Sequence, residues 1–184
     1  MNKLVDIIPL SLSGLKLIKP RVYQDSRGFF VESYHSHKYA DIGIDVRFEQ
    51  DNHSYSKKGT IRGMHFQQKP GQAKLVTVCE GEIYDVAVDI RPDSPTFGKW
   101  QGIYLNGDTC EQFFIPVGFA HGFCVVSEKA HVLYKVSSVY DPDEEKGFRF
   151  DDPQIAIQWP ESDPVVSSRD KEALFFADLF EVCR

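Results

Sequence analysis

Short runs in which apolar and polar residues alternate recur along most of the chain, and each run ends near Gly, Pro, Asp or Asn. Such runs, rich in Val, Ile, Tyr, Phe and Thr, are typical of the strands of an all-β domain. The clearest is Lys74–Arg91, where a turn at Glu80–Glu82 predicts a β-hairpin with one apolar face. Further strands are predicted at Gly28–Tyr34, Ile44–His53, Thr60–Gln67, Gly102–Leu105, Glu111–Ile115, Gly122–Val126 and Ala130–Tyr140.

Helical periodicity is scarce by comparison. Only His37–Ile42 and the C-terminal Arg169–Phe180 have the spacing of short helices. Many short strands with few helices indicate an all-β fold with closed or double-sheet architecture, and a jelly-roll sandwich or barrel fits best. The interior of so small a barrel holds one small ligand, so polar residues that point inward would line a site.

Composition narrows the class of protein. The length of 184 residues and a hydrophobic content of 42% predict a single domain over residues 1–184. A net charge of −6 without a basic stripe argues against a nucleic-acid polymer as partner. No apolar run predicts a signal peptide or a membrane span. The widely spaced Cys79, Cys110, Cys124 and Cys183 are interpreted as reduced thiols of a cytoplasmic protein.

The segment Thr60–Gln67 contains the first candidate for chemistry. Alternation along a strand predicts one face with Arg62, Met64 and Phe66, and an opposite face with Gly63, His65 and Gln67. A histidine that faces the interior beside a glycine indicates a group brought close to a ligand. The alternative is a core histidine with a structural hydrogen bond.

A second histidine follows a tight turn in the P-x-G-x-x-H segment that ends at His121. His65 and His121 from separate strands are potential metal ligands. A metal site also needs a further histidine and a carboxylate, and Gln67 stands where an H-x-H segment would have its second histidine. We therefore expect no metal.

Two polar segments are candidates for anion and base recognition. Arg27 lies beside Gly28, which suits a bidentate contact with phosphate, although a solvated arginine in a turn has the same pattern. Gln50, Asp51 and Asn52 have the hydrogen-bonding capacity to contact a base edge, or simply end a strand.

Together these segments resemble the dTDP-4-dehydrorhamnose 3,5-epimerase family from about Lys19 to Asp170. The resemblance rests on an ordered set of motifs: D-x-R-G-F-F-x-E at Asp25–Glu32, QDNHS at Gln50–Ser54, IRGMHFQ at Ile61–Gln67, GEIYDVAVDIRPDSPTFGKW at Gly81–Trp100, FIPVGFAHGF at Phe114–Phe123, LYK at Leu133–Lys135 and SSRD at Ser167–Asp170.

The resemblance implies a metal-independent cupin jelly roll, usually a homodimer, which needs no cofactor. The resemblance also implies an enzyme that inverts C3 and C5 of dTDP-4-dehydro-6-deoxy-D-glucose on the route to dTDP-L-rhamnose. By analogy, His65 is the proton acceptor supported by Asp170, Tyr134 is the proton donor, and Tyr140 stacks on thymine. The positions that match substrate contacts are Arg27, Glu32, Gln50, Asn52, Arg62, Lys74, His121, Glu145 and Arg169.

These roles agree with the chemistry of a 4-keto sugar. The C4 ketone acidifies the hydrogens on both neighbouring carbons, because the resulting carbanion delocalises onto oxygen as an enolate. An imidazole with an ordinary pKa of ~6.5 accepts such a proton at neutral pH. Lys74 and Arg62 offer positive charge to the enolate oxygen, and Tyr134 is expected to return a proton from the opposite side.

The chain departs from the family at Val139, where many members have the first of two consecutive tyrosines, and at Arg169, where lysine is common. Glu144 competes with Glu145 for the substrate contact. Val139 keeps open a single-carbon epimerase or a ketoisomerase acting on a related sugar. The alternatives from other classes are a metal-dependent cupin oxygenase and a non-catalytic binder of nucleotide sugars.

Overall fold

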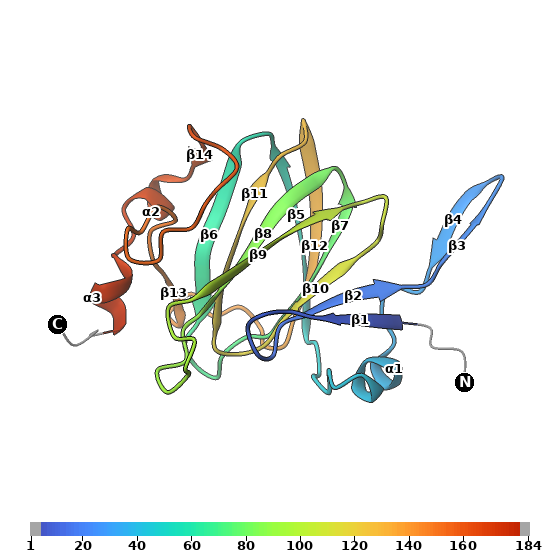
Figure 1. Cartoon of the computed structure of the whole chain (residues 1–184), viewed down its shortest axis with the longest axis horizontal. Coiled ribbons are helices and arrows are strands. Elements are labelled where there is room, and N and C mark those ends of the chain that lie inside the picture. Colours follow the sequence, from blue (N-terminus) through green and yellow to red (C-terminus); the bar gives the residue numbers. More distant parts are fainter. Residues whose placement is uncertain (1–4, 181–184) are drawn as a thin grey trace.

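The computed structural model describes residues 5–180, which form two large β-sheets that face each other and a small separate sheet (Figure 1). The first sheet has the order β1-β2-β10-β7-β12-β5, with β1 Val5–Pro9, β2 Lys16–Pro20, β10 Gln112–Ile115, β7 Lys74–Glu80, β12 Lys129–Val136 and β5 Gln50–Lys57. The second has the order β13-β6-β11-β8-β9, with β13 Glu145–Gly147, β6 Thr60–Gln67, β11 Phe119–Val125, β8 Glu82–Asp89 and β9 Trp100–Asn106, and with β14 Val165–Val166 beside β6. This confirms the predicted all-β jelly roll.

The main apolar core fills the space between the two sheets towards one side of the sandwich. Both sheets contribute to it, as Val76 and Val132 of the first and Ala87 and Phe123 of the second show. Burial of these side chains supplies the main driving force for bringing the sheets together. On the other side of the sandwich the inward positions of β5, β6, β7, β11 and β12 become polar, which leaves room for a site.

The outer face of each sheet is covered as well. The segment around α1 (Ser36–Asp41) packs Tyr39 and Ile44 onto Leu75 of the first sheet. The chain after β13 packs Phe148, Ile155 and Phe176 onto the second sheet. The strands that form the site are therefore buried from both sides and held in place.

The predicted hairpin at Lys74–Arg91 is wrong in its pairing. The two strands β7 and β8 have the expected positions, but they lie in different sheets and do not pair with each other. β7 pairs with β10 and β12, whereas β8 pairs with β11 and β9. Gly81, with a φ of +83°, allows the chain to turn from one sheet to the other, and a Cβ there would lie 2.0 Å from the carbonyl oxygen of Lys129.

Several predicted boundaries also shift. The strand predicted at Ile44–His53 begins only at Gln50, because Ile44 packs under α1 and its N–H binds the carbonyl of Tyr39. The strand predicted at Ala130–Tyr140 ends at Val136. That predicted at Gly28–Tyr34 ends at Val31 and belongs to the small sheet.

The single C-terminal helix predicted at Arg169–Phe180 is two helices, α2 (Ser168–Lys171) and α3 (Phe176–Phe180). The chain between them leaves the helical path because Leu174 forms a β-bridge with Phe148. The N–H of Phe176 then binds the Asp152 carboxylate at 2.7 Å, which satisfies an amide at the start of α3. Tertiary pairing thus overrides a helical apolar pattern.

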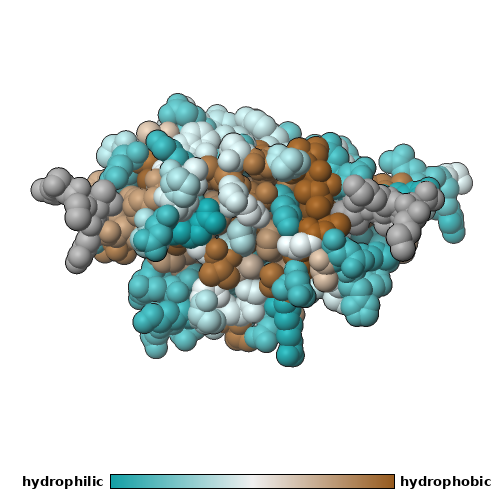
Figure 2. All heavy atoms as spheres, turned by 60° about the horizontal axis from the view of Figure 1, so that its bottom comes forward, coloured by the Kyte–Doolittle hydropathy of each residue, from teal (hydrophilic) through white to brown (hydrophobic). Residues whose placement is uncertain are grey.

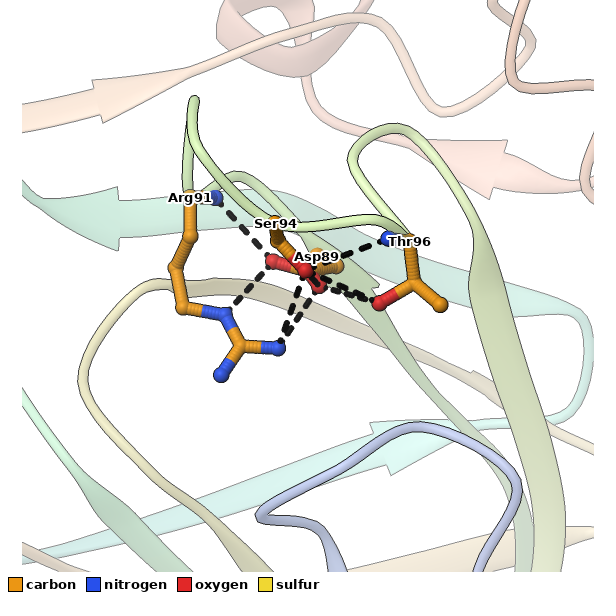
Figure 3. A network of polar contacts seen from close by, with 4 residues as sticks. All are labelled: Asp89, Arg91, Ser94 and Thr96. Carbon is orange, nitrogen blue, oxygen red and sulfur yellow. Dashed lines mark hydrogen bonds and ion pairs between the residues drawn. The ribbon is translucent and has the colours of Figure 1, made fainter.

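The connection between β8 and β9 is held by a buried carboxylate (Figure 3). Asp89 is fully buried and accepts hydrogen bonds from the Arg91 guanidinium and from the hydroxyls of Ser94 and Thr96. Burial opposes its charge, but these donors prevail and lower the pKa of Asp89 to about 2. Arg91 in turn lies over the ring of Phe119, the first residue of β11, at 4.6 Å. The network therefore fixes the start of a strand that carries site residues.

We expect Asp89→Asn to lower the free energy of unfolding by about 2–3 kcal/mol at pH 7, because the amide removes the ion pair and weakens the acceptor. The folded pKa of Asp89 is below its ordinary 3.8, so the stabilisation is present above that value and is lost as the pH falls through about 2. Urea unfolding should show that the difference in the free energy of unfolding between wild type and variant disappears over that range.

Asp151→Asn is a matched control, because it breaks a bidentate pair with Arg149 on the surface and should lower the free energy of unfolding by less than about 1 kcal/mol. Equal losses for both variants would contradict the role of burial.

A two-stranded arm extends away from the sandwich (Figure 1). It consists of β3 (Val22–Asp25) and β4 (Gly28–Val31), which pair only with each other among the described strands. Tyr23, Phe29 and Phe30 on this arm are 45%, 56% and 68% exposed. A hairpin of two strands with exposed aromatic side chains is marginally stable by itself, so the arm needs a surface to pack against.

The face shown in Figure 2 is mixed, with polar side chains over most of it and brown apolar patches between them. No helix within residues 5–180 combines the length and apolar character that a membrane crossing requires.

Candidate active site

A cavity of about 860 Å³ opens between the two sheets, on the side where their inward positions turn polar. Strands of both sheets contribute to it: β5, β7 and β12 from the first sheet, and β6, β11 and β13 from the second. The segment from β14 to α2 closes one side. Eleven residues singled out in the sequence line it: Gln50, Asn52, Arg62, His65, Lys74, His121, Tyr134, Tyr140, Glu145, Arg169 and Asp170.

A β-bulge in β6 decides how the central strand presents its side chains. His65 pairs with His121 of β11, and Arg62 pairs with Phe123. The three residue steps from Arg62 to His65 on β6 therefore lie opposite only two residue steps on β11, so β6 contains one extra residue. The extra residue reverses the alternation, and Arg62 therefore lines the cavity together with His65. The predicted assignment of Arg62 and His65 to opposite faces is wrong for this reason.

Gly63 makes this bulge possible. Its φ is +130°, and a Cβ at this position would lie 2.5 Å from the Cα of Gly122 on the neighbouring strand. Only glycine tolerates both the backbone conformation and the close approach. The glycine next to His65 thus serves the shape of the strand that carries the histidine.

His65 is held by a buried carboxylate. Its Nε2 lies 2.7 Å from Oδ1 of Asp170, whose side chain is only 6% exposed. Ser167 caps α2 by accepting a hydrogen bond from the N–H of Asp170, and the N–H of Gly63 donates to Oδ2 of Asp170 at 3.4 Å. Burial opposes the charge of Asp170, but the bond to His65 and these donors lower its pKa below the ordinary value. A carboxylate at Nε2 keeps that nitrogen protonated and leaves Nδ1 as the proton acceptor.

A second pair of the same kind lies beside the first. Nε2 of His121 is 2.8 Å from Oδ1 of Asp85, and the two side chains are 5% and 0% exposed. Burial lowers the pKa of His121, although the carboxylate of Asp85 works in the other direction. No role for Asp85 was predicted from the sequence. The available signal was an acidic residue at an inward position of β8, between the apolar inward residues Ile83 and Ala87.

Lys74 brings positive charge into the same space. It is buried at the start of β7, and burial lowers the pKa of its ammonium to about 8, while Glu145 and Asp85 act to raise it. A buried lysine ammonium has few water molecules around it, and the low local dielectric constant strengthens its interaction with a nearby anion.

Tyr134 lines the cavity from β12, in the sheet that faces His65. Burial raises the pKa of its phenol, with Glu145 acting in the same direction and Arg62 against it. Tyr134 is therefore a neutral hydroxyl at ordinary pH and has a proton to give.

The rim of the cavity is a polar network. Glu145 accepts a hydrogen bond from the Tyr140 hydroxyl at 2.9 Å and forms an ion pair with Arg169 at 2.7 Å. Gln50 accepts from the N–H of Tyr140 and donates to Asn52. Tyr140 is 47% exposed and presents an aromatic face at the entrance.

Three predicted substrate contacts do not reach the cavity of their own chain. Arg27 lies on the arm, where it pairs with Asp25 at 2.6 Å, and Glu32 pairs with Lys38. Asp51 points away on the other face of β5 and pairs with Lys135 at 2.9 Å. Alternation along β5 explains the last case, because Gln50 and Asn52 face inward on either side of Asp51.

The structure shows where the residues lie whose roles the sequence left open. Glu145 lines the cavity, whereas Glu144 lies outside it and accepts a hydrogen bond from the N–H of Lys69. Val139 is 62% exposed and does not line the cavity, although it precedes Tyr140 at the rim. Within residues 5–180, no group of three or more His, Cys, Asp or Glu side chains is arranged to hold a metal ion.

Comparison with known proteins gives consistent results. The profile of a family described as dTDP-4-dehydrorhamnose 3,5-epimerase matches residues 9–178. The dTDP-4-dehydrorhamnose 3,5-epimerase of Methanothermobacter thermautotrophicus is 45% identical over 167 residues, which are 89% of this chain and 90% of the relative. The dTDP-4-dehydrorhamnose 3-epimerase of Streptomyces niveus is 41% identical and covers 92% of this chain and 83% of its own length.

A solved structure agrees with these matches. The crystal structure of dTDP-6-deoxy-D-glucose-3,5-epimerase from Legionella pneumophila, in complex with dTDP-4-keto-L-rhamnose, has a TM-score of 0.91 at 45% identity. The match covers 98% of this chain and 95% of that one. Sequence and fold are therefore similar to the same group of proteins over nearly the whole length.

Proposed function

The chain belongs to the dTDP-4-dehydrorhamnose 3,5-epimerase family, and we propose that it inverts C3 and C5 of dTDP-4-dehydro-6-deoxy-D-glucose to give dTDP-4-dehydro-L-rhamnose. One observation carries the assignment of roles. The imidazole of His65, held by Asp170, faces a cavity whose other wall presents Tyr134 and Lys74. These are the acceptor, the donor and the charge that an inversion next to a ketone requires.

The first step is removal of a proton by His65. The C–H bond next to the ketone breaks, the proton moves to Nδ1, and the electron pair delocalises onto the C4 oxygen. Asp170 accepts a hydrogen bond from Nε2, keeps the ring in the accepting tautomer and stabilises the imidazolium that forms. Glycine at position 63 lets the strand present this ring to the substrate.

Lys74 stabilises the enolate. Its buried ammonium interacts more strongly with a full negative charge on the C4 oxygen than with the neutral ketone, so it lowers the barrier. Arg62 adds positive charge at the mouth of the cavity.

Tyr134 completes the inversion. It lies on the sheet opposite His65, so a proton from its hydroxyl reaches the face of the carbon that the base has not used. The phenolate that remains regains a proton from solvent. No step requires a metal or a cofactor.

The rim residues bind the nucleotide part of the substrate. Tyr140 offers a ring for stacking on thymine, and Gln50 and Asn52 offer amides for its edge. Arg169 supplies a guanidinium that suits the pyrophosphate.

Incubation of the protein with the 4-keto substrate in deuterated water tests this function. We expect deuterium at both C3 and C5 of the product. Label at neither carbon would contradict the proposal and leave only binding of the nucleotide sugar. Label at one carbon would favour the single-carbon epimerase, for which the similarity to the 3-epimerase of Streptomyces niveus and the valine at position 139 are the specific observations.

We further propose that the protein works as a homodimer in which the arm of one copy covers the cavity of the other. Arg27 and Glu32 lie outside the cavity of their own chain, and Phe29 and Phe30 leave a large aromatic surface exposed beside them. A second copy would cover these rings and bring Arg27 to the pyrophosphate, with the same exchange on both sides of a two-fold axis.

Mixing two inactive variants tests the exchange. His65→Asn removes the base, and Arg27→Ala/Glu32→Ala removes the arm contacts. If the arm crosses between copies, each mixed dimer contains one intact site, and an equimolar mixture should regain about a quarter of the wild-type activity. If each arm serves its own chain, the mixture stays as inactive as its components. Analytical ultracentrifugation of Phe30→Asp checks the dimer itself and should show a shift towards monomer.

A cytoplasmic location is also part of the proposal. Cys79, Cys110 and Cys124 are free thiols, as expected for a reducing compartment, and Cys183 lies outside the described residues. That residues 1–184 form one domain stays a prediction.

A further inference from the structure

Two histidines meet on the outer face of the first sheet. His53 lies on β5 and His131 on β12, 78 residues apart in the chain, and Nε2 of His53 is 2.9 Å from Nδ1 of His131. His131 alternates along β12 with Ala130 and Val132, which point into the apolar core. Its ring, and the ring of His53 bonded to it, therefore lie on the side of the sheet that faces away from the core. The chemistry proposed above uses neither histidine.

We propose that His53 and His131 form a binding site for a divalent transition-metal ion, which is held by one nitrogen of each ring. Imidazole nitrogen is a preferred ligand of Ni²⁺, Cu²⁺ and Zn²⁺, whereas Mg²⁺ and Ca²⁺ select oxygen ligands. The site lies outside the catalytic steps. It therefore does not depend on the proposed function and supplies no cofactor to it.

The distance between the two nitrogens fits a shared ion. Nitrogens that each bind one metal ion at about 2.0–2.1 Å lie about 2.9 Å apart when their bonds form a right angle, and about 3.3–3.4 Å apart in a tetrahedron. The observed 2.9 Å therefore matches two neighbouring positions of a square-planar or octahedral ion. Ni²⁺ and Cu²⁺ favour such geometry with nitrogen ligands.

Both rings have the freedom and the lone pairs that the ion requires. Their centroids are 5.1 Å apart, and His53 is exposed, so its ring can turn towards an ion shared with His131. In the neutral pair one of the two facing nitrogens carries a proton, and moving this proton to the far nitrogen of the same ring leaves two lone pairs for the metal. Tyr55 packs on His131, with ring centroids 5.0 Å apart, and limits the rotation of that ring.

Strand pairing holds the two side chains on one surface. His53 pairs with Leu133. His131 pairs with Tyr55, so the two histidines are diagonal neighbours on adjacent antiparallel strands. Because the backbone is already fixed, binding an ion orders only the side chains. β5 pairs only with β12 among the described strands, so an ion held by both rings joins an edge strand to its neighbour.

A carboxylate beside the pair supplies negative charge. Glu80 on β7 is directly paired with His131, and its carboxylate forms an ion pair with Lys129 at 2.8 Å. The pKa of Glu80 is lowered mainly by Lys129, and His131 acts in the same direction, which places the carboxylate within electrostatic reach of the imidazole. Glu80 therefore offsets part of the charge of a bound cation. Water takes the coordination positions that the two nitrogens leave open.

Calorimetric titration with Ni²⁺ tests the site. Ni²⁺ is the probe because Cu²⁺ oxidises free thiols, and the chain has several. The untagged protein, in a buffer without phosphate or nucleotide, should bind one Ni²⁺ per chain and should not bind Mg²⁺ at the same concentration. His53→Gln and His131→Gln should each weaken Ni²⁺ binding at least about tenfold, because one remaining ring does not chelate. Ni²⁺ should also raise the melting temperature of the wild type, but not that of either variant.

His37→Gln and His65→Asn are the controls. His37 lies beside His35 on the surface, with ring centroids 5.7 Å apart, and His65 lies in the cavity. Both control variants should keep the wild-type affinity for Ni²⁺ and the rise in melting temperature.

Two results would overturn the proposal. One is the absence of Ni²⁺ binding by the wild type, and the other is binding that survives in both His53→Gln and His131→Gln, because the ion then lies elsewhere. Circular dichroism checks that each variant folds, and His53→Gln, at the exposed position, suffices if the other does not. None of these measurements uses catalysis, so failure of the proposed function is a separate result.

Discussion

His65→Asn lowers the rate of formation of the doubly inverted sugar by about three orders of magnitude, the range expected for loss of a general base. Asparagine has roughly the size of imidazole and keeps a polar contact with Asp170, but it does not accept a proton at neutral pH. The substitution therefore removes chemistry and leaves the cavity in place. The decrease should appear in kcat, measured by chromatography of the dTDP-sugars, with dTDP binding within a few fold of wild type.

His37→Asn is the matched control for this variant. His37 is exposed on α1, which packs on the outer face of the first sheet away from the cavity, so kcat should stay at the wild-type value. A His65→Asn variant with more than about a tenth of the wild-type kcat would remove His65 from the mechanism.

Lys74→Met reduces kcat by about two to three orders of magnitude, the range found when one donor to a developing oxyanion is lost. Methionine fills the space of the lysine stem without its charge. Both carbons share the one C4 oxygen, so deuterium uptake at C3 and C5 should fall by the same factor. A loss confined to one of the two carbons would contradict this shared role of Lys74.

Lys74 also predicts how activity and stability change with pH. Burial lowers its pKa from 10.5 to about 8, so enolate stabilisation is present at lower pH and is lost as the pH rises through about 8. The charged form is disfavoured in the folded state, so a stability cost is fully present below pH 8 and is relieved between pH 8 and 10.5. Lys74→Met should therefore unfold at a higher urea concentration than wild type at pH 7, although it is less active.

A pH–rate profile and urea unfolding of both proteins provide the measurements. Lys58→Met serves as control, because Lys58 is exposed and lies 4.0 Å from Glu128 in a surface pair that contributes little. If wild-type kcat rises steadily beyond pH 9, or if Lys74→Met keeps its activity, the ammonium is not the group that stabilises the enolate.

The sequence determined the fold class and most of the chemistry. Alternating apolar positions gave strands near their observed places, because a strand between two layers must bury every second side chain. The motif around His65, the P-x-G-x-x-H turn before His121 and the tyrosine after Leu133 marked residues that line one cavity. Strand positions and site motifs of this kind can be predicted from the sequence because each depends on only a few adjacent residues.

Tertiary structure alone decided which strands pair and which side chains meet. Alternation shows that β7 and β8 are strands, but not that a turn at Gly81 sends them into different sheets, because pairing depends on partners far away in the chain. The bulge in β6 placed Arg62 beside His65, and an extra residue on one strand is visible only against its neighbour. Asp85 showed its importance only when β11 brought His121 to it, from 36 residues further along the chain. Arg27 lies on the arm, away from the cavity of its own chain. The chemistry of a side chain determines which groups it can bind, but the path of the chain determines where in the molecule that side chain lies.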